Sequence, residues 1–93
     1  MQPLQESEID ARLASLAPGW HREDGAIVCE RECANFAAAI TLINRIAVLA
    51  EQDNHHPDLC VHSYKQLRIT LSTHSAGGIT ERDFALAAQI DAL

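Results

Sequence analysis

The five histidines are the residues of this chain that could do chemistry; His21 and His62 are expected to be surface or core residues, and His55, His56 and His74 are the candidates. His55 and His56 are adjacent and precede a proline, and His74 follows a segment in which apolar and polar residues alternate. Imidazole titrates near neutral pH, so it both donates and accepts protons under ordinary conditions. Glu51 precedes the histidine pair by four residues, and Asp83 follows His74 by nine. Imidazoles and carboxylates brought to one place predict a site for proton transfer.

Zinc binding is the alternative chemistry for the same residues. The three histidines together with Cys60 contain the imidazole and thiolate groups that zinc accepts. Adjacent histidines rarely face one ion, however, and the spacing matches no usual zinc signature, so we expect no metal. The three cysteines have no C-x-x-C spacing, which indicates reduced thiols in a cytoplasmic protein. The sequence contains no P-loop, G-x-S-x-G or G-x-G-x-x-G motif, and Gly77-Gly78 indicates a turn.

Length and charge exclude several classes of protein. The chain has 93 residues, which predicts a single domain over residues 1–93. Thirteen acidic residues against seven basic ones give a net charge of −6, so we expect no binding to nucleic acid. No apolar run approaches the length of a membrane span, and the polar, acidic amino terminus resembles no signal or transit peptide. We therefore expect a cytoplasmic protein with no membrane partner.

The first third of the chain predicts a helix and then a hairpin. Ser7 is the expected N-cap, one apolar face follows it, and Pro18-Gly19 ends the helix. That face consists of Ile9, Leu13 and Leu16. Trp20 opens an extended stretch, and a turn at 23–25 leads into a returning strand over 26–31 because Asp-Gly accepts positive φ at low cost.

The remainder of the chain predicts a long helix, a second hairpin and a last helix. Apolar residues recur at helical spacing from Asn35 to about Asp53, and Pro57 bars any continuation. Strands are expected over 59–64 and 67–72. The last helix is expected to begin at Thr80 with a capping box to Asp83. This order predicts an α+β fold, a four-stranded antiparallel sheet with three helices packed on one face.

This architecture gathers the candidate residues at one end of the sheet. In a hairpin the start of the first strand lies beside the end of the second, so His55 and His56 are expected to meet His74. The long helix ends at the same place and brings Glu51 and Asn54, while the last helix starts nearby with Asp83.

The same residues match a known pattern. Glu51, the His55-His56-Pro57 run, Tyr64, His74 and Asp83 follow the spacing E-x3-H-H-P-x6-Y-x9-H-x8-D, which resembles the signature of the pterin-4a-carbinolamine dehydratases. The segments ITLSTH at 69–74 and GGITERDFALAAQID at 77–91 are similar to that family's carboxy-terminal strand and helix. The resemblance covers about residues 20 to 91 and implies the same sheet with three helices.

The resemblance also implies an activity and a set of site residues. The family dehydrates 4a-hydroxytetrahydrobiopterin to quinonoid dihydropterin, without a metal or other cofactor, and so regenerates the cofactor of aromatic amino acid hydroxylases. It implies that His55, His56 and His74 are catalytic. From the chemistry of the leaving hydroxyl we expect His55 and His74 to act as acid and base, in an order left open, and His56 mainly to orient the substrate. The implied substrate-binding residues are Trp20 at the pocket rim, Glu51, Asn54, Pro57, Ser72, Thr73, Ser75, Ala76 and Asp83. Three positions depart from the common pattern of the family, namely Asn54, Leu59 and Ser75.

Partners and a second role also follow from the resemblance. It implies a homodimer or homotetramer, which would cover the open edges of the sheet, a pterin substrate, and an aromatic amino acid hydroxylase as a pathway partner. Some relatives have non-catalytic roles, so a binding or assembly protein on the same scaffold is the alternative to the enzyme.

Overall fold

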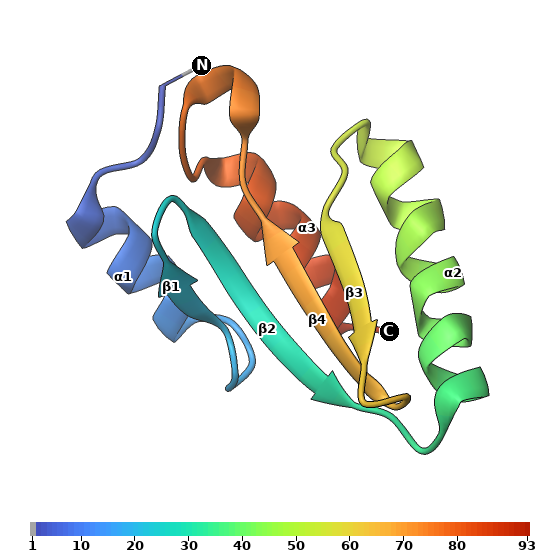
Figure 1. The fold of residues 1–93 in the computed structure, drawn as a ribbon. Helices are drawn as coiled ribbons and strands as arrows, with labels where there is room; N and C mark the ends of the chain where they lie inside the picture. The colour runs from blue at the N-terminus through green and yellow to red at the C-terminus, as the bar shows by residue number, and fades with distance from the viewer. Residues whose placement is uncertain (1) are drawn as a thin grey trace.

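The computed structural model describes residues 2–93 and confirms the predicted α+β fold (Figure 1). The elements in chain order are α1 (Glu6–Ala14), β1 (His21–Glu23), β2 (Ala26–Glu32), α2 (Phe36–Asp53), β3 (Asp58–His62), β4 (Gln66–Leu71), the short 3-10 helix η1 (His74–Ala76) and α3 (Glu81–Asp91). The strands form one four-stranded sheet in the order β1-β2-β4-β3, and every neighbouring pair is antiparallel.

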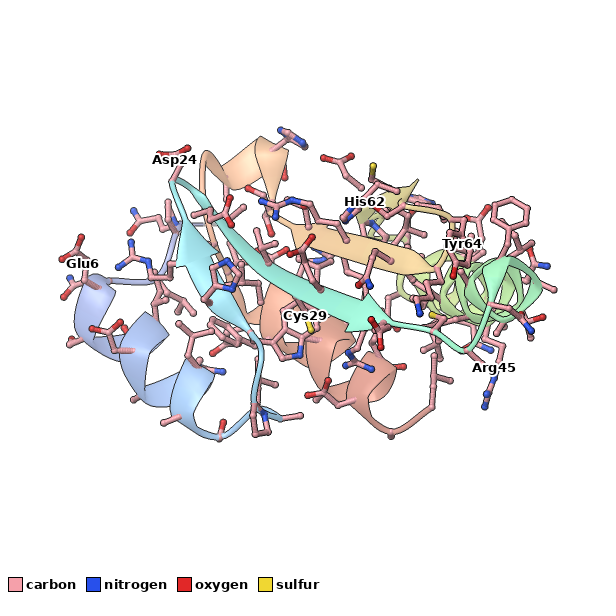
Figure 2. The ribbon with its side chains drawn as sticks, turned by 60° about the horizontal axis from the view of Figure 1, so that its bottom comes forward. Glu6, Asp24, Cys29, Arg45, His62 and Tyr64 are labelled. Atoms are coloured by element: carbon pink, nitrogen blue, oxygen red, sulfur yellow. The ribbon has the colours of Figure 1, made fainter. Side chains whose placement is uncertain are left out.

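The hydrophobic core lies between the helices and one face of this sheet. Because side chains alternate along a strand, β2 and β4 each present every second residue to the core. Ile27 pairs with Leu71 and Cys29 with Ile69 in register, and all four side chains are buried. They join one cluster with residues of all three α-helices, among them Ile9, Ile46 and Leu86. Figure 2 shows α1 and α3 beneath the sheet, with the other face of the sheet left open.

Two of the three helices begin where the sequence predicts. Asn35 caps α2 by accepting a hydrogen bond from the backbone N–H of Ala38 at 2.8 Å. Thr80 and Asp83 form the predicted capping box at the start of α3. The prediction for the first helix is wrong at its start, because α1 begins at Glu6 with Gln5 as N-cap rather than at Ser7.

The physical reason for the earlier start lies outside the helix. The backbone N–H of Leu4 donates to the carbonyl of Ile79 at 2.8 Å, which directs the chain into α1 without a side-chain cap. Glu6 and Glu8 in the first turn add favourable charge at the helix N-terminus. The helix ends at Ala14, so Leu16 packs against the core from the loop that follows.

The second hairpin is tighter than expected. The strand predicted over 59–64 is Asp58–His62, because Ser63 and Tyr64 have φ values of 50° and 54° and form the turn. The strand predicted over 67–72 is Gln66–Leu71. After β4, His74–Ala76 form η1, and Gly77, with φ of 77°, ends it.

This reversal brings the chain back on itself beside His74. The backbone N–H of Thr73 donates to the carbonyl of Gly78 at 3.0 Å, and that of Ala76 donates to the carbonyl of Thr73 at 3.0 Å. His74 is therefore carried on a closed loop between β4 and α3. Within residues 2–93, no helix combines the length and the apolar character that crossing a membrane requires.

Candidate active site

Three histidines, His55, His56 and His74, line one cleft of about 250 Å³ beside the end of β4. His55 and His56 follow Asn54, whose left-handed backbone (φ 48°) ends α2 and turns the chain toward β3. His74 comes from η1, on the connection that leaves β4. Asn54, Ser72, Thr73, Ser75 and Arg82 complete the lining. The structure thus brings together imidazoles from segments about twenty residues apart.

His55 is the buried histidine of this cleft, with 7% of its surface exposed. Its Nε2 lies 2.5 Å from Oδ1 of Asp83, which is fully buried at the start of α3. The backbone N–H of His55 donates to the carbonyl of Ala50 at 3.0 Å, so both ends of the residue are held. A carboxylate accepts this hydrogen bond, which places the proton of the neutral ring on Nε2 and leaves Nδ1 as the acceptor.

Asp83 is itself held by a buried network. Its Oδ2 accepts hydrogen bonds from the backbone N–H of Thr80 and from Oγ1 of Thr73, both at 2.9 Å. Since the Thr73 hydroxyl donates to Asp83, the Thr80 hydroxyl, 2.8 Å away, donates to Thr73 Oγ1. Both oxygens of Asp83 therefore face donors, which fixes the orientation of the carboxylate. Its hydrogen bond to Nε2 in turn fixes the orientation of the His55 ring.

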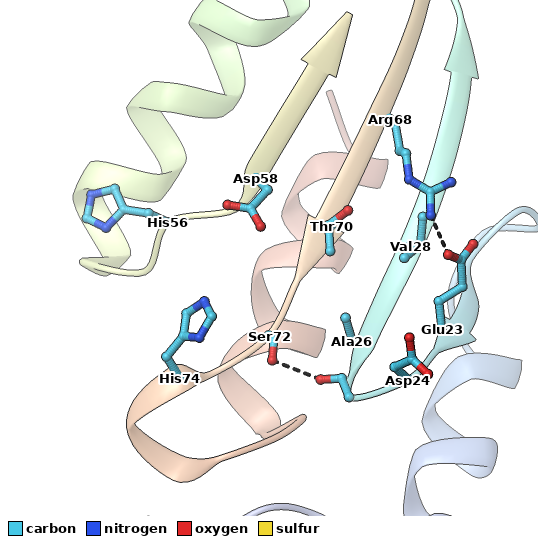
Figure 3. A pocket seen from close by; sticks show the side chains of 11 residues that line it. Glu23, Asp24, Ala26, Val28, His56, Asp58, Arg68, Thr70, Ser72 and His74 are labelled. Atoms are coloured by element: carbon cyan, nitrogen blue, oxygen red, sulfur yellow. Dashed lines mark hydrogen bonds and ion pairs between the residues drawn. The ribbon is translucent and has the colours of Figure 1, made fainter.

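His56 and His74 are both exposed and more loosely held. Nε2 of His56 lies 3.0 Å from Oε2 of Glu51, and these side chains are 59% and 76% exposed. A pair this exposed orients the ring weakly. Figure 3 shows His56 and His74 at one end of the adjoining pocket, on the segments before β3 and after β4. The site thus combines one buried imidazole, held by Asp83, with two exposed ones.

Arg82 is a lining residue that the sequence reasoning missed. Its guanidinium donates to the carbonyl of Asn54 at 2.7 Å and to that of Asp53 at 3.1 Å, which joins α3 to the end of α2. A signal was present, because a cation in the first turn of a helix opposes the helix dipole and needs another reason to be there.

Trp20 is not brought to the histidines. It is 7% exposed in the core, and its Nε1–H donates to Oδ1 of Asp91 at 2.8 Å. Asp91 also accepts from the Arg31 guanidinium at 2.5 Å and from the backbone N–H of Ala17 at 3.0 Å. This arrangement fastens the end of α3 to β2 and to the loop after α1. The tryptophan has a structural role in this geometry, and within residues 2–93 it is absent from the lining of three cavities that contain histidines.

The other predicted binding residues divide into two groups. Asn54, Ser72, Thr73 and Ser75 line the cleft, whereas Glu51, Pro57, Ala76 and Asp83 do not. Glu51 and Asp83 each contact one imidazole of the cleft, Glu51 that of His56 and Asp83 that of His55. Among residues 2–93, no three His, Cys, Asp or Glu side chains gather as metal ligands would. In this part of the chain the zinc alternative therefore has no ligand set.

The fold and the site define a class of protein: an α+β domain with a histidine cleft at one end of a four-stranded antiparallel sheet. The family model described as pterin 4 alpha carbinolamine dehydratase matches residues 2–93, and the chain belongs to this family. A protein of Chloroflexus aurantiacus named "Putative pterin-4-alpha-carbinolamine dehydratase" is 48% identical over 91 residues, which cover 98% of this chain and 96% of that protein.

Two solved structures share the fold of this chain. A crystal structure titled as a transcriptional coactivator/pterin dehydratase from Brucella melitensis superposes with a TM-score of 0.90 at 33% identity, covering 98% of this chain and 97% of that one. A pterin dehydratase-like protein described as a RuBisCO assembly factor of the alpha-carboxysome has a TM-score of 0.62 at 22% identity, over 78% of this chain and 83% of its own. At that identity the second likeness concerns the fold alone.

Proposed function

We propose that this protein is a 4a-hydroxytetrahydrobiopterin dehydratase, a hydro-lyase that works by histidine acid–base catalysis. The observation that carries the proposal is the buried pair of His55 and Asp83, which opens onto a cleft shared with His56 and His74. Membership of the family supports the substrate class. The reaction would serve tetrahydrobiopterin recycling for aromatic amino acid hydroxylases in the cytoplasm.

The chemistry requires one proton to be delivered and one to be removed. The C4a–O bond breaks and the hydroxyl leaves as water, which requires a proton on the leaving oxygen. N5 loses its proton, and its electron pair forms the C4a=N5 double bond of the quinonoid product. The proton count balances if one imidazole donates and another accepts.

The geometry favours His55 as the base. Asp83 holds the proton of the neutral ring on Nε2, so Nδ1 has the free lone pair. When Nδ1 takes a proton, the buried carboxylate stabilises the imidazolium that forms. His74, exposed at the cleft, is then the acid that protonates the leaving hydroxyl. His56, with Glu51 behind it, orients the ring of the substrate.

Single replacements test this assignment. His55→Ala and His74→Ala should each lower kcat for dehydration by about 10²- to 10⁴-fold, the usual contribution of a positioned acid or base. His62→Ala is the matched control, because His62 is exposed on β3 and bonded to Glu30, remote from the cleft. Urea unfolding checks that each variant is folded. Full turnover by both cleft variants would refute the assignment.

We also propose that the chain self-associates as a dimer or tetramer. Its large exposed apolar side chains support this proposal, because such groups on α2 and on the β3–β4 turn gain from being covered. They include Phe36 at 55%, Val48 at 58% and Tyr64 at 63% exposed. Sedimentation equilibrium gives the mass directly, and a monomer at micromolar concentration would contradict the proposal.

A further inference from the structure

A second hollow adjoins the histidine cleft, between the end of α2 and one face of α3. It has a volume of about 300 Å³ and is lined by Asp53, His55, Arg82, Ala85 and Gln89. His55 and Arg82 also line the cleft, so these two side chains belong to the wall between the two spaces. The mechanism proposed above gives His55 a role and Arg82 none.

Arg82 has different partners from the arginines of the sheet. Arg31 and Arg68 each form an ion pair with a carboxylate. One terminal nitrogen of the Arg82 guanidinium instead donates to two main-chain carbonyls, that of Asn54 at 2.7 Å and that of Asp53 at 3.1 Å. Since α2 has no basic residue in its own last turn, this guanidinium supplies the positive charge that the C-terminus of a helix favours.

The carbonyl of Asn54 belongs to the peptide group that joins this residue to His55. The backbone N–H groups of both residues bond back into α2, in the pattern of a Schellman motif, while Asn54 takes the left-handed conformation. The last carbonyls of a helix have no donor within the helix. Arg82 provides that donor for Asp53 and Asn54, so it holds the chain at the point where it leaves α2 for the histidine pair.

Two consecutive residues of α3 therefore hold His55 at two points. Asp83 accepts a hydrogen bond from Nε2 of the ring, and Arg82 donates to the peptide group that precedes the residue. Because Arg82 and Asp83 are neighbours on one helix, the two points of attachment keep a fixed separation. A displacement of the His55 ring from its place at the cleft breaks one of these bonds.

We propose that Arg82 is a positioning residue for the dehydration, which holds the peptide group between Asn54 and His55 where the ring reaches both Asp83 and the cleft. The inference rests on the proposed function, because it takes His55 as the base. Arg82 acts through the backbone and needs no contact with the substrate. Its effect should therefore fall on the chemical step more than on substrate binding.

Arg82→Ala removes the donor and should lower kcat by about 10- to 100-fold, since a displacement of about 1 Å at a catalytic group costs up to this much. KM should change less than about 3-fold. The backbone amide of His55, which donates to the carbonyl of Ala50, should exchange its hydrogen at least about 10-fold faster. Arg82→Met, which keeps most of the apolar stem, makes the same test if the alanine variant does not fold.

Rescue shows that the lost donor causes the effect. Arg82→Lys keeps a charged donor and should retain at least about one third of kcat. In Arg82→Ala the hollow gives access to the vacated place, so guanidinium at millimolar concentration should raise kcat at least about 5-fold, and sodium chloride at equal ionic strength should not. Arg12→Ala is the matched control, because Arg12 bonds Glu81 in the same first turn of α3 and is remote from the histidines. The control should keep the wild-type kcat and amide exchange.

The outcomes separate this inference from the proposed function. Wild-type kcat in both Arg82→Ala and Arg82→Met would overturn the inference and keep the function. A KM raised at least about 10-fold, with kcat and the exchange of the His55 amide unchanged, would also overturn it, because Arg82 would then bind the substrate directly. An inactive wild type would overturn the proposed function and the catalytic part of the inference, while amide exchange would still decide whether Arg82 holds His55.

Discussion

Replacing Asp83 by asparagine should reverse the tautomer of His55 while the fold survives. The amide is nearly the same shape as the carboxylate, and its oxygen can still accept from the Thr80 N–H and the Thr73 hydroxyl. Its NH₂ group then points at Nε2 of His55, where a carboxylate oxygen now lies at 2.5 Å. A donor there forces Nε2 to accept, so the ring proton moves to Nδ1 and the base loses its lone pair.

The two effects of this substitution differ greatly in size. One charge-assisted hydrogen bond is exchanged for a neutral one and the capping interactions remain, so the free energy of unfolding should fall by about 1–2 kcal/mol. This is a modest part of the roughly 5–15 kcal/mol typical of small domains. A base in the wrong tautomer loses about 10²- to 10⁴-fold in kcat. The loss of activity should therefore far exceed the loss of folded protein.

Three measurements on Asp83→Asn check this reasoning. Formation of quinonoid dihydropterin gives kcat, urea unfolding gives the stability, and the ¹⁵N shifts of the His55 ring report the tautomer. Asp91→Asn is the matched control, because it makes the same exchange on the same helix in a network that contains no histidine. Wild-type kcat in the Asp83 variant, or an unchanged tautomer with kcat lost, would refute the role assigned to Asp83.

Three further predictions concern the scaffold. Asp91→Ala leaves the Trp20 indole N–H without its acceptor and should lower the free energy of unfolding by about 1–3 kcal/mol with kcat retained, as urea unfolding and turnover will show. The hydrogen bond between His21 and Glu23 raises the pKa of His21 and lowers that of Glu23, so the pair should stabilise the fold mainly between about pH 4.5 and 6.5, and less as pH rises through the raised histidine pKa or falls through the lowered glutamate pKa. Unfolding of wild type and His21→Gln at pH 5.5 and 9 should therefore differ more at the lower pH, and an equal difference at both would contradict the assignment. Gly77→Ala introduces a side chain at φ of 77° with open space around it, so only backbone strain acts, and thermal unfolding should occur about 4–8 °C lower.

Local patterns in the sequence were sufficient for most of the fold. The spacing of apolar residues in α2, the capping box at Thr80 and the Asp-Gly turn before β2 each depend on neighbours a few residues away. Hairpin geometry then placed His55 and His56 near His74, because antiparallel strands bring the start of one beside the end of the next. The start of α1 escaped prediction since the contact that directs it, from Leu4 to Ile79, is not local.

Tertiary packing decided how the site residues act. Sequence reasoning could identify Asp83 as a helix cap, and Oδ2 does bond the Thr80 N–H, but Oδ1 meets an imidazole 28 residues away. The indole of Trp20, which was expected at the pocket rim, likewise donates to Asp91, 71 residues away. Helix caps and apolar periodicities depend on interactions between residues close in sequence, so the sequence alone can predict them. Which atoms meet across the core depends on how α3 packs against the end of α2 and the sheet, and the chain acquires that arrangement only on folding.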